Sequence, residues 1–374
     1  MQITFVSNYI NHHQIPVSDR LYELCDGSYT FIQTEPMEAE RVSMGWNPKS
    51  MERPYVKLYY EAKEDCDRLI MESDCVIFGG TEDESIILPR IEQGLFTVRY
   101  SESIYKEGRW KFISPRGLKK KYHDHVRFKD YPVYMLCSGA HVKGDFKLIH
   151  AYKGKMLKYG YFPKLEIYDD VHEIRRDNAV TEILWASRFI DWKHPEIMPS
   201  IATGLVNAGK SFHMTMIGSG ELLEKTKADV TARGLNDYFT FEEKMSPEEV
   251  RTRMRKADIF VQTSDRKEGW GAVINEAMNS GCVTIGAKEI GAAPYLITSG
   301  RNGFLYKACH KEELIHHIMW AMENREDALK MGTEAYETIR DTWNADVAAE
   351  RLYAFIKSRG ATINDYEDGP LSRA

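Results

Sequence analysis

The sequence predicts an α/β protein made of two doubly wound domains that face a cleft. Three observations lead to this prediction. Short apolar runs rich in β-branched and aromatic residues alternate with helical stretches. The alternation starts a second time after a polar stretch, Tyr159 to about Asn178, which contains a proline that disfavours helix. The length of 374 residues also suits two domains, at roughly 150 residues per domain.

The first half contains the first set of strands. Each is a run of four or five residues that ends in a polar or glycine-rich turn, as buried strands do. We expect strands at Ile3–Ser7, Tyr29–Gln33, Cys75–Phe78, Phe96–Tyr100 and Val133–Cys137, with helical stretches between several of them, Glu61–Glu72 for example. Strands that alternate with helices favour a parallel sheet covered on both faces, which binds ligands beyond the carboxyl ends of its strands.

The second half repeats the pattern. We expect strands at Glu182–Ala186, Phe212–Ile217, Phe239–Phe241, Ile259–Gln262 and Val283–Ile285. Helices are expected at Glu196–Asn207, Glu221–Arg233, Pro247–Lys256 and Ala272–Asn279, and three more close the chain, at Lys311–Glu323, Arg325–Thr342 and Ala345–Lys357. These elements predict a first domain over 1–165 and a second over 166–345. Residues 346–374 are expected to form a helix that packs back on the first domain, then a frayed tail.

Composition and charge exclude several classes of protein. The chain is 43% hydrophobic and 28% charged, which excludes a mainly disordered chain, a collagen and a coiled coil. Acidic residues outnumber basic ones, 56 to 50, so a global nucleic-acid binder is not expected. No apolar run approaches the roughly 18 to 20 residues that span a membrane, and no secretory signal is visible. We expect a cytoplasmic protein with reduced thiols, because its six cysteines show no C-x-x-C spacing.

One basic segment, Arg109–Lys129, departs from this acidic balance, since it holds eight basic residues and a single acid, Asp124. Two interpretations remain open. The segment is either a solvated loop, or a patch that contacts an anionic membrane at its inner face, where each cation contributes about 1 kcal/mol. Trp110 and Phe112 are either interfacial anchors or part of the core. An RNA-binding role is less favoured, given the acidic remainder.

The segment Thr263–Tyr306 is the most informative for function. Glu268 lies in a polar loop after a strand, and Glu276 lies in the helix that follows. Ionised carboxylates only accept hydrogen bonds, so two of them along one wall suit a ligand with hydroxyls at both ends, such as a sugar nucleotide. Gly269 and Gly271 let the backbone approach a ligand. The helix start at Gly271 and the loop Gly291–Ala293 offer N–H groups to a phosphate. From the spacing alone, a solvated loop and an ordinary helical glutamate remain the alternative.

Glu268 through Glu276 resembles the E-x7-E motif of the retaining nucleotide-sugar glycosyltransferases of family 4. The similarity extends through S-D-R-K-E-G-W-G-A-V-I-N-E-A-M to the G-x-x-G-F-L-Y run at Gly300–Tyr306. Upstream, Ile183–Phe189 with Lys193 resembles that family's strand-then-Arg…Lys element, and Ile217–Glu221 resembles its G-x-G-E turn. The resemblance covers roughly 180 to 310 almost continuously and is much weaker over the first domain.

The resemblance implies the GT-B fold, in which two Rossmann-like domains face an interdomain cleft, with the acceptor on the first domain and the donor on the second. Glu276 would accept the ribose hydroxyls, and Glu268 would contact the donor sugar and help place its anomeric carbon. Arg188 and Lys193 would hold the diphosphate, because fixed cations stabilise the leaving group's growing charge. A surface ion pair for Arg188 and an ordinary loop position for Lys193 are the alternatives. The other implied donor contacts are Gly220, Gly269, Trp270, Gly271, Gly291, Ala292 and Ala293.

The family's reaction retains anomeric configuration and needs neither a divalent metal nor a cofactor beyond the nucleotide-sugar co-substrate. The D-x-D at Asp65–Asp67 falls in an expected helix, where positions i and i+2 point to different faces. We therefore predict no metal site.

Three departures from the family pattern concern the sugar and the acceptor. The glycine loop after the first strand is replaced by Asn8–Gln14, which carries His12 and His13. The G-G-x-P-E element ends in Tyr295 instead of a carboxylate, so donor-sugar contacts are expected to differ. The histidine after the fourth strand is replaced by a stretch with Glu102. His12, His13 and Glu102 are the candidate acceptor-side residues, with a polar turn and a helix cap as the alternatives.

The sequence thus predicts a retaining, metal-independent hexosyltransferase. It would use a nucleoside-diphosphate sugar, expected to be a UDP-sugar, and a hydroxyl of a glycan or lipid-linked glycan, in cell-surface polysaccharide assembly. A nucleotide-sugar epimerase on the same scaffold, a phosphorylase-like enzyme and a non-catalytic sugar-nucleotide-binding protein are the alternatives. The donor sugar, base, acceptor, linkage and oligomeric state are left open.

Overall fold

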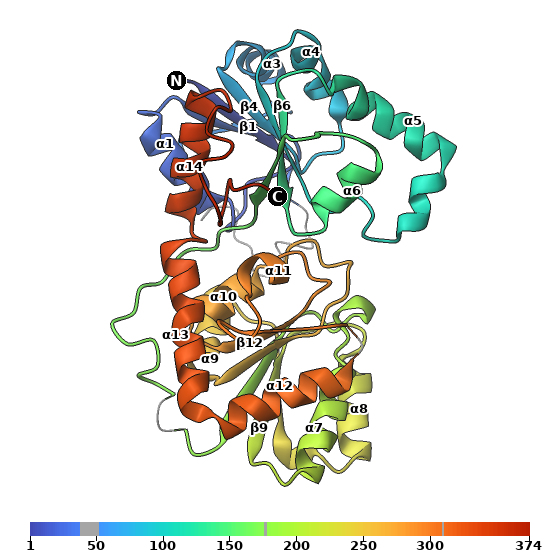
Figure 1. The fold of residues 1–374 in the computed structure, drawn as a ribbon, viewed down its shortest axis with the longest axis vertical. Coiled ribbons are helices and arrows are strands. Elements are labelled where there is room, and N and C mark those ends of the chain that lie inside the picture. Colours follow the sequence, from blue (N-terminus) through green and yellow to red (C-terminus); the bar gives the residue numbers. More distant parts are fainter. Residues whose placement is uncertain (38–51, 176–177, 309) are drawn as a thin grey trace. The chain divides into compact units, whose positions relative to one another are not determined.

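The computed structural model describes residues 1–37, 52–175, 178–308 and 310–374. The chain divides into two compact units. Unit 1 comprises Met1–Lys164 and Trp343–Ala374, and unit 2 comprises Leu165–Thr342. Each unit has its own parallel sheet with helices on both sides (Figure 1). The predicted fold class, two Rossmann-like doubly wound domains, is confirmed.

Unit 1 is built on a seven-stranded sheet, counted over the described residues, in the order β3-β2-β1-β4-β5-β6-β7. Every neighbouring pair is parallel. The strands are β1 (Ile3–Ser7), β2 (Tyr29–Gln33), β3 (Val56–Leu58), β4 (Cys75–Phe78), β5 (Thr97–Ser101), β6 (Val133–Ser138) and β7 (Met156–Tyr159). The strand order reverses between β1 and β4, which makes this pair the topological switch point.

Helices and short 3-10 helices complete unit 1. They are α1 (Ile15–Leu24), α3 (Lys63–Glu72), η2 (Glu84–Ile86), α4 (Leu88–Glu92), η3 (Arg109–Ile113), α5 (Pro115–Asp124), η4 (Val126–Phe128), α6 (Val142–Leu148) and α14 (Ala345–Lys357). Helix α14 returns to this unit and packs on α1, where Arg20 of α1 pairs with Glu350 at 2.7 Å.

The residues after Gly360 were expected to fray, and the structure differs. Leu371 and Ser372 are buried, and the amide of Leu371 donates to Lys158 O at 2.8 Å. The amide of Lys158 donates back to Ser372 O, also at 2.8 Å. The polar tail therefore covers the free edge of β7, and its backbone hydrogen bonds hold it there although its composition does not suggest order.

Unit 2 repeats the topology with six described strands in the order β10-β9-β8-β11-β12-β13, all parallel. The strands are β8 (Thr181–Ala186), β9 (Phe212–Ile217), β10 (Phe239–Glu242), β11 (Ile259–Gln262), β12 (Val283–Ala287) and β13 (Phe304–Tyr306). The helices are η5 (Asp191–Lys193), α7 (Ile197–Asn207), α8 (Leu223–Ala232), η6 (Asn236–Tyr238), α9 (Pro247–Lys256), α10 (Val273–Asn279), α11 (Ala293–Leu296), α12 (Lys311–Glu323) and α13 (Arg325–Asp341). Here the switch point lies between β8 and β11.

The described residues contain buried thiols, but neither a membrane-spanning helix nor a group of metal ligands. The five described cysteines are buried free thiols, and Cys309 lies outside the described residues. In the ranges given above, no helix combines the length and apolarity needed to cross a bilayer. Nor does that part of the chain hold a group of three or more His, Cys, Asp or Glu side chains that could bind a metal ion.

Candidate active site

Two loops of unit 2 meet at its switch point. The loop after β8 carries Lys193, and the loop after β11 carries Glu268. The two side chains form an ion pair, and both are largely buried. Burial lowers the pKa of Lys193, since it disfavours the ammonium, and the pairing with Glu268 opposes this effect. Two residues 75 positions apart thus bring opposite charges to the edge where doubly wound sheets bind ligands.

Hydrogen bonds tie these two loops together. The indole N–H of Trp185, on β8, donates to Thr263 Oγ1 at 2.8 Å. The Thr263 hydroxyl in turn donates to the backbone oxygen of Lys193 at 2.5 Å. Ser264 Oγ donates to Glu268 Oε2 at 3.1 Å. Lys193 and Glu268 are therefore held by neighbouring groups as well as by their own attraction.

Trp192 lies beneath the two predicted phosphate-binding cations. Its ring centroid is 4.2 Å from Lys193 Nζ and 5.5 Å from the guanidinium carbon of Arg188. The face of an indole ring attracts cations, so the ring offsets part of the repulsion between two like charges. The structure thus brings Arg188, Lys193 and Glu268 close together around Trp192.

Glu276 lies on α10 and is 6% exposed. Burial raises the pKa of its carboxyl group to about 7, although Arg251 acts in the opposite direction. Among the described residues, its Oε1 atom is buried and accepts no hydrogen bond. A buried acceptor without a donor is costly in the absence of a ligand. A hydroxyl-bearing ligand would satisfy it.

The loop around Glu268 holds two of the predicted donor-contact residues, Gly271 and Trp270. Gly271 has φ +91°, and a Cβ there would lie 2.8 Å from Ile290 Cγ2 and 3.3 Å from Glu268 Cγ. Trp270 is fully buried and its indole N–H donates to Asn275 Oδ1 at 2.8 Å, so this side chain packs inside unit 2.

The amide of Ala292 does not offer a free N–H to a phosphate, contrary to expectation. It donates to Trp270 O at 2.9 Å, and this bond holds the loop Gly291–Ala293 beside the loop that follows β11. Gly291 and Ala293 flank it, and Ala293 begins the short helix α11. Helices α10 and α11 have seven and four residues, so their macrodipoles are short.

Gly220 and Gly218 bring the β9 loop against the β8 loop. A Cβ at Gly220 would lie 2.4 Å from Phe189 O, and one at Gly218 would lie 2.0 Å from Ser187 O. The amide of Phe189 also donates to Ser219 O at 2.9 Å. These glycines therefore position the backbone on either side of Arg188.

The three candidate acceptor-side residues belong to one cluster in unit 1. The rings of His12 and His13 are 3.8 Å apart, and His13 stacks on Tyr161 at 5.8 Å. The hydroxyl of Tyr161 donates to Glu102 at 2.5 Å, and Lys106 pairs with the same carboxylate. These residues come from loops after β1, β5 and β7. Tyr161 and Lys106 gave no signal in the sequence, because only the fold brings them beside Glu102.

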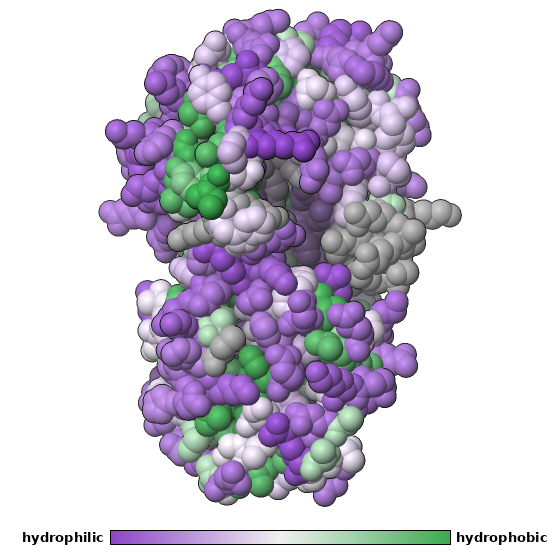
Figure 2. All heavy atoms as spheres, turned by 90° about the vertical axis from the view of Figure 1, so that its right-hand side faces the viewer, coloured by the Kyte–Doolittle hydropathy of each residue, from purple (hydrophilic) through white to green (hydrophobic). Residues whose placement is uncertain are grey.

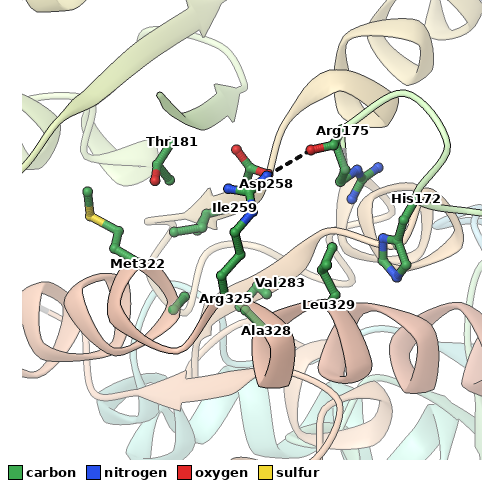
Figure 3. A pocket seen from close by; sticks show the side chains of 12 residues that line it. His172, Arg175, Thr181, Asp258, Ile259, Val283, Met322, Arg325, Ala328 and Leu329 are labelled. Atoms are coloured by element: carbon green, nitrogen blue, oxygen red, sulfur yellow. Dashed lines mark hydrogen bonds and ion pairs between the residues drawn. The ribbon is translucent and has the colours of Figure 1, made fainter. Parts of the chain in front are cut away.

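A cavity of about 30 Å³ lies at the opposite end of the unit 2 sheet. Figure 3 shows His172, Arg175, Asp258 and Arg325 around it, and Arg325 donates to Arg175 O at 2.9 Å. Its strand residues, such as Thr181 and Val283, lie at amino ends. The cavity has room for a water molecule or two and none for a nucleotide.

Two units, each built on a parallel doubly wound sheet, give the chain the GT-B class of fold. Residues 170–338 match the family model described as glycosyl transferases group 1. The matched range lies within unit 2, Leu165–Thr342.

One curated relative is similar to part of this chain. A GDP-mannose-dependent alpha-(1-6)-phosphatidylinositol monomannoside mannosyltransferase of Mycobacterium tuberculosis is 23% identical over 154 residues, 40% of this chain and 40% of that protein. The match thus spans less than half of the relative.

Three solved structures share the fold. Anabaena Alr3699/HepE in complex with UDP superposes with a TM-score of 0.71 at 14% identity, over 96% of this chain and 100% of that one. A Rickettsia africae glycosyltransferase gives 0.71 at 14% identity, over 96% and 98%. The pneumococcal O-GlcNAc transferase GtfA in complex with UDP and GlcNAc gives 0.70 at 10% identity, over 96% and 99%. At these identities the likeness concerns the fold.

Proposed function

We propose that the protein is a retaining glycosyltransferase that moves a hexosyl group from a nucleoside-diphosphate sugar to a hydroxyl of a glycan or lipid-linked glycan. The observation that carries this proposal is the switch-point site of unit 2. There, the Lys193–Glu268 pair is accompanied by Glu276, whose buried Oε1 accepts no hydrogen bond within the described part of the chain. The match of this unit to glycosyl transferases group 1 supports the same reaction.

Each charged group has a role in the proposed reaction. The bond between the anomeric carbon and the diphosphate breaks, the acceptor oxygen forms the new bond to that carbon, and the acceptor's proton passes to an oxygen of the departing diphosphate. Arg188 and Lys193 stabilise the departing diphosphate, so no divalent metal is required. Glu276 accepts the two ribose hydroxyls, and Glu268 orients the sugar. Gly220, Gly269, Gly271 and Gly291 let the backbone approach the donor.

The acceptor is proposed to bind unit 1 through the cluster of His12, His13 and Glu102, together with Tyr161. Imidazole and carboxylate groups suit the hydroxyls of a sugar. We place the reaction in cell-surface polysaccharide assembly, in the cytoplasm, and take uridine as the base.

The basic segment is proposed to contact an anionic membrane at its inner face. Trp110, Ile113, Leu118 and Tyr122 are exposed large hydrophobic side chains within thirteen consecutive residues, and Lys119 is exposed among them. In Figure 2, which shows the side where α5 lies in Figure 1, hydrophobic residues form small groups among hydrophilic ones. Such a surface suits a peripheral contact that combines cations with shallow anchors.

Vesicle binding tests the membrane contact. Replacing Arg116 and Lys119 by glutamate removes two cations from α5, and at about 1 kcal/mol each the affinity for anionic vesicles should fall roughly 30-fold or more. Lys330→Glu, on an exposed face of unit 2, is the matched control. Equal binding to neutral and anionic vesicles would contradict the proposal.

The donor site is tested by calorimetric titration with UDP, GDP and ADP, with and without EDTA, on wild type and Glu276→Ala. We expect micromolar binding of UDP that survives EDTA and is lost in the variant. If GDP bound in its place, the base assignment would change. If none of the three bound, a non-catalytic protein would become the better interpretation.

A further inference from the structure

Arg251 faces Glu276 across the contact between α9 and α10. Its side chain comes from the middle of α9, whose first turn is fixed by a capping box at Ser246. Arg251 is 8% exposed, and its Nη1 atom lies 3.8 Å from Glu276 Oε1. On its other side, Nη2 lies 3.3 Å from the carboxylate of Glu248, which is 74% exposed. A buried cation therefore lies between a buried carboxylate and an exposed one.

The separation of 3.8 Å decides what this pair can do. It is short enough for a strong attraction between two groups removed from water. It is too long for a hydrogen bond, which needs about 3.2 Å or less. Arg251 therefore stabilises the negative charge of Glu276 without occupying its Oε1 atom, which stays available as an acceptor.

The charge state of Glu276 determines whether it can receive a diol. An ionised carboxylate accepts two hydroxyl protons, whereas a protonated carboxyl group has lost one of its acceptor positions to its own O–H. Burial without a neighbouring cation favours the protonated form. An uncompensated glutamate at this position would thus bind a diol poorly at neutral pH.

We propose that Arg251 is a positioning residue that favours the ionised form of Glu276, the form that accepts both ribose hydroxyls of the nucleotide. This inference rests on the proposed function, because it concerns the same diol. Within the described part of the chain, the charged groups that act on Glu276 are both on α9: Arg251 favours its charge and Glu248 opposes it. Glu248 is exposed and already lies beside Arg251, so Arg251 is the group whose removal matters.

The experiment measures nucleotide affinity between pH 5.5 and pH 9 for wild type, Arg251→Met and Arg251→Lys. The ionisation of the phosphate is common to all three, so the ratio of dissociation constants is compared. In wild type, nucleotide affinity should rise with pH as Glu276 loses its proton, and the pH at half of this rise is the midpoint. We expect Arg251→Met to move this midpoint up by at least one pH unit. Affinity at pH 7 should then fall about fivefold and return close to wild type at pH 9. Arg251→Lys should keep the wild-type midpoint.

Arg255→Met is the matched control, because Arg255 lies on the same helix but stacks on the Tyr168 ring at 4.5 Å. It should leave the midpoint unchanged. A midpoint is measured within one variant, so a smaller folded fraction does not move it. An equal loss of nucleotide affinity at every pH would make Arg251 a direct ligand or a structural residue and would overturn the inference. A pH dependence of affinity identical to that of wild type would overturn it too.

A second readout needs no nucleotide. Carboxyl ¹³C resonances of Glu276, assigned by comparison with Glu276→Gln, report its titration in wild type and Arg251→Met. An upward shift in the variant supports the role of Arg251 even if no nucleotide binds, in which case only the proposed function fails. The same titration curve in both proteins would refute the inference, whatever the nucleotide does.

Discussion

Lys193 and Glu276 are each more than nine-tenths buried, yet their charges are compensated in different ways. Lys193 has a carboxylate partner in contact, so its charge is balanced before any ligand arrives. Glu276 has a cation nearby but no donor on its Oε1 atom among the described residues. An anionic ligand would have to compete with Glu268 for Lys193. A neutral hydroxyl could donate a hydrogen bond to Glu276 without displacing any group.

Replacing Lys193 by alanine tests the first of these residues. The diphosphate gains charge as the glycosidic bond breaks, so a fixed cation lowers the energy of the transition state more than that of the bound donor. We expect kcat to fall by about 10²- to 10³-fold with a much smaller change in donor affinity. Lys267→Ala is the control, since this half-exposed lysine pairs with Asp191. A loss confined to KM would contradict this role.

The raised pKa of Glu276 also affects stability. Its folded-state pKa of about 7 lies above the ordinary value of 4.5, so the folded protein holds this proton more tightly. The resulting stabilisation is complete below pH 4.5 and is lost as pH rises through 7. We expect its contribution to the free energy of unfolding to decline by about 3 kcal/mol over that range.

Urea denaturation at pH 5 and pH 7.5 measures this decline. Glu276→Gln cannot titrate and should lose this part of the pH dependence, with the rest of the profile unchanged. The same slope in both proteins would mean that Glu276 titrates near its ordinary pKa.

At the residue level, the sequence revealed groups that share one motif and missed those that only the fold brings together. The seven-residue spacing pointed to Glu268 and Glu276 because both lie in one loop-and-helix segment. Arg251, Thr263 and Tyr161 are ordinary residues in the sequence. Their importance comes from neighbours on other elements, and periodicity carries no information about such pairs.

At the element level, the buried strands were predicted and three edge strands were not. Strands such as β1 and β11 are buried along their whole length and are mostly apolar, because both faces of a parallel sheet are covered. The missed strands β3, β7 and β13 have three or four residues each and lie at sheet edges. A strand with one neighbour needs fewer apolar residues, so its run is too short to stand out from a loop.

The contact between the β8 and β9 loops leads to a prediction about Gly218. Its φ is +141°, and a methyl carbon added at its Cβ position would lie 2.0 Å from Ser187 O, which leaves no room for a side chain. Gly218→Ala should push the β8 loop, and with it Arg188, away from its place. We expect a loss of about 2–4 kcal/mol of stability together with weaker nucleotide binding.

Gly234→Ala distinguishes the strain of a positive φ from the steric clash expected at Gly218. Gly234 also has a positive φ, +70°, but a Cβ there would meet nothing within 4 Å. This control should cost only about 1 kcal/mol and leave nucleotide binding unchanged. If both variants lost stability equally, the close approach of the two loops would not be the cause. Thermal denaturation and nucleotide titration supply both measurements.

At the level of the whole molecule, both units use the same order, in which the first strand lies between the second and the fourth. This repetition explains why the position of the candidate site at the carboxyl edge could be expected from the alternation of strands and helices. The return of the last helix to unit 1 was expected from the sequence as well, whereas the path of the tail after Gly360 was not. Residues 343–374 belong to unit 1 although unit 2 precedes them, and no local pattern encodes a contact with β7 some 200 residues earlier.

Removing residues 360–374 should therefore affect unit 1 alone. The deletion uncovers the edge of β7, removes the buried side chains of Leu371 and Ser372, and breaks the pairing of Lys158 with Asp368. Nucleotide, by contrast, is proposed to bind unit 2, where a concentration of 100 times Kd would add about 2.7 kcal/mol to the free energy of unfolding of that unit.

In calorimetry of the shortened chain, we expect two unfolding transitions, of which the lower belongs to unit 1 and only the upper moves with nucleotide. The full-length chain is the reference, and Glu276→Ala should abolish the upward shift in both. If the deletion and the nucleotide moved the same transition, the two units would unfold as one, and the assignment of the chain end to unit 1 would have no separate energetic meaning.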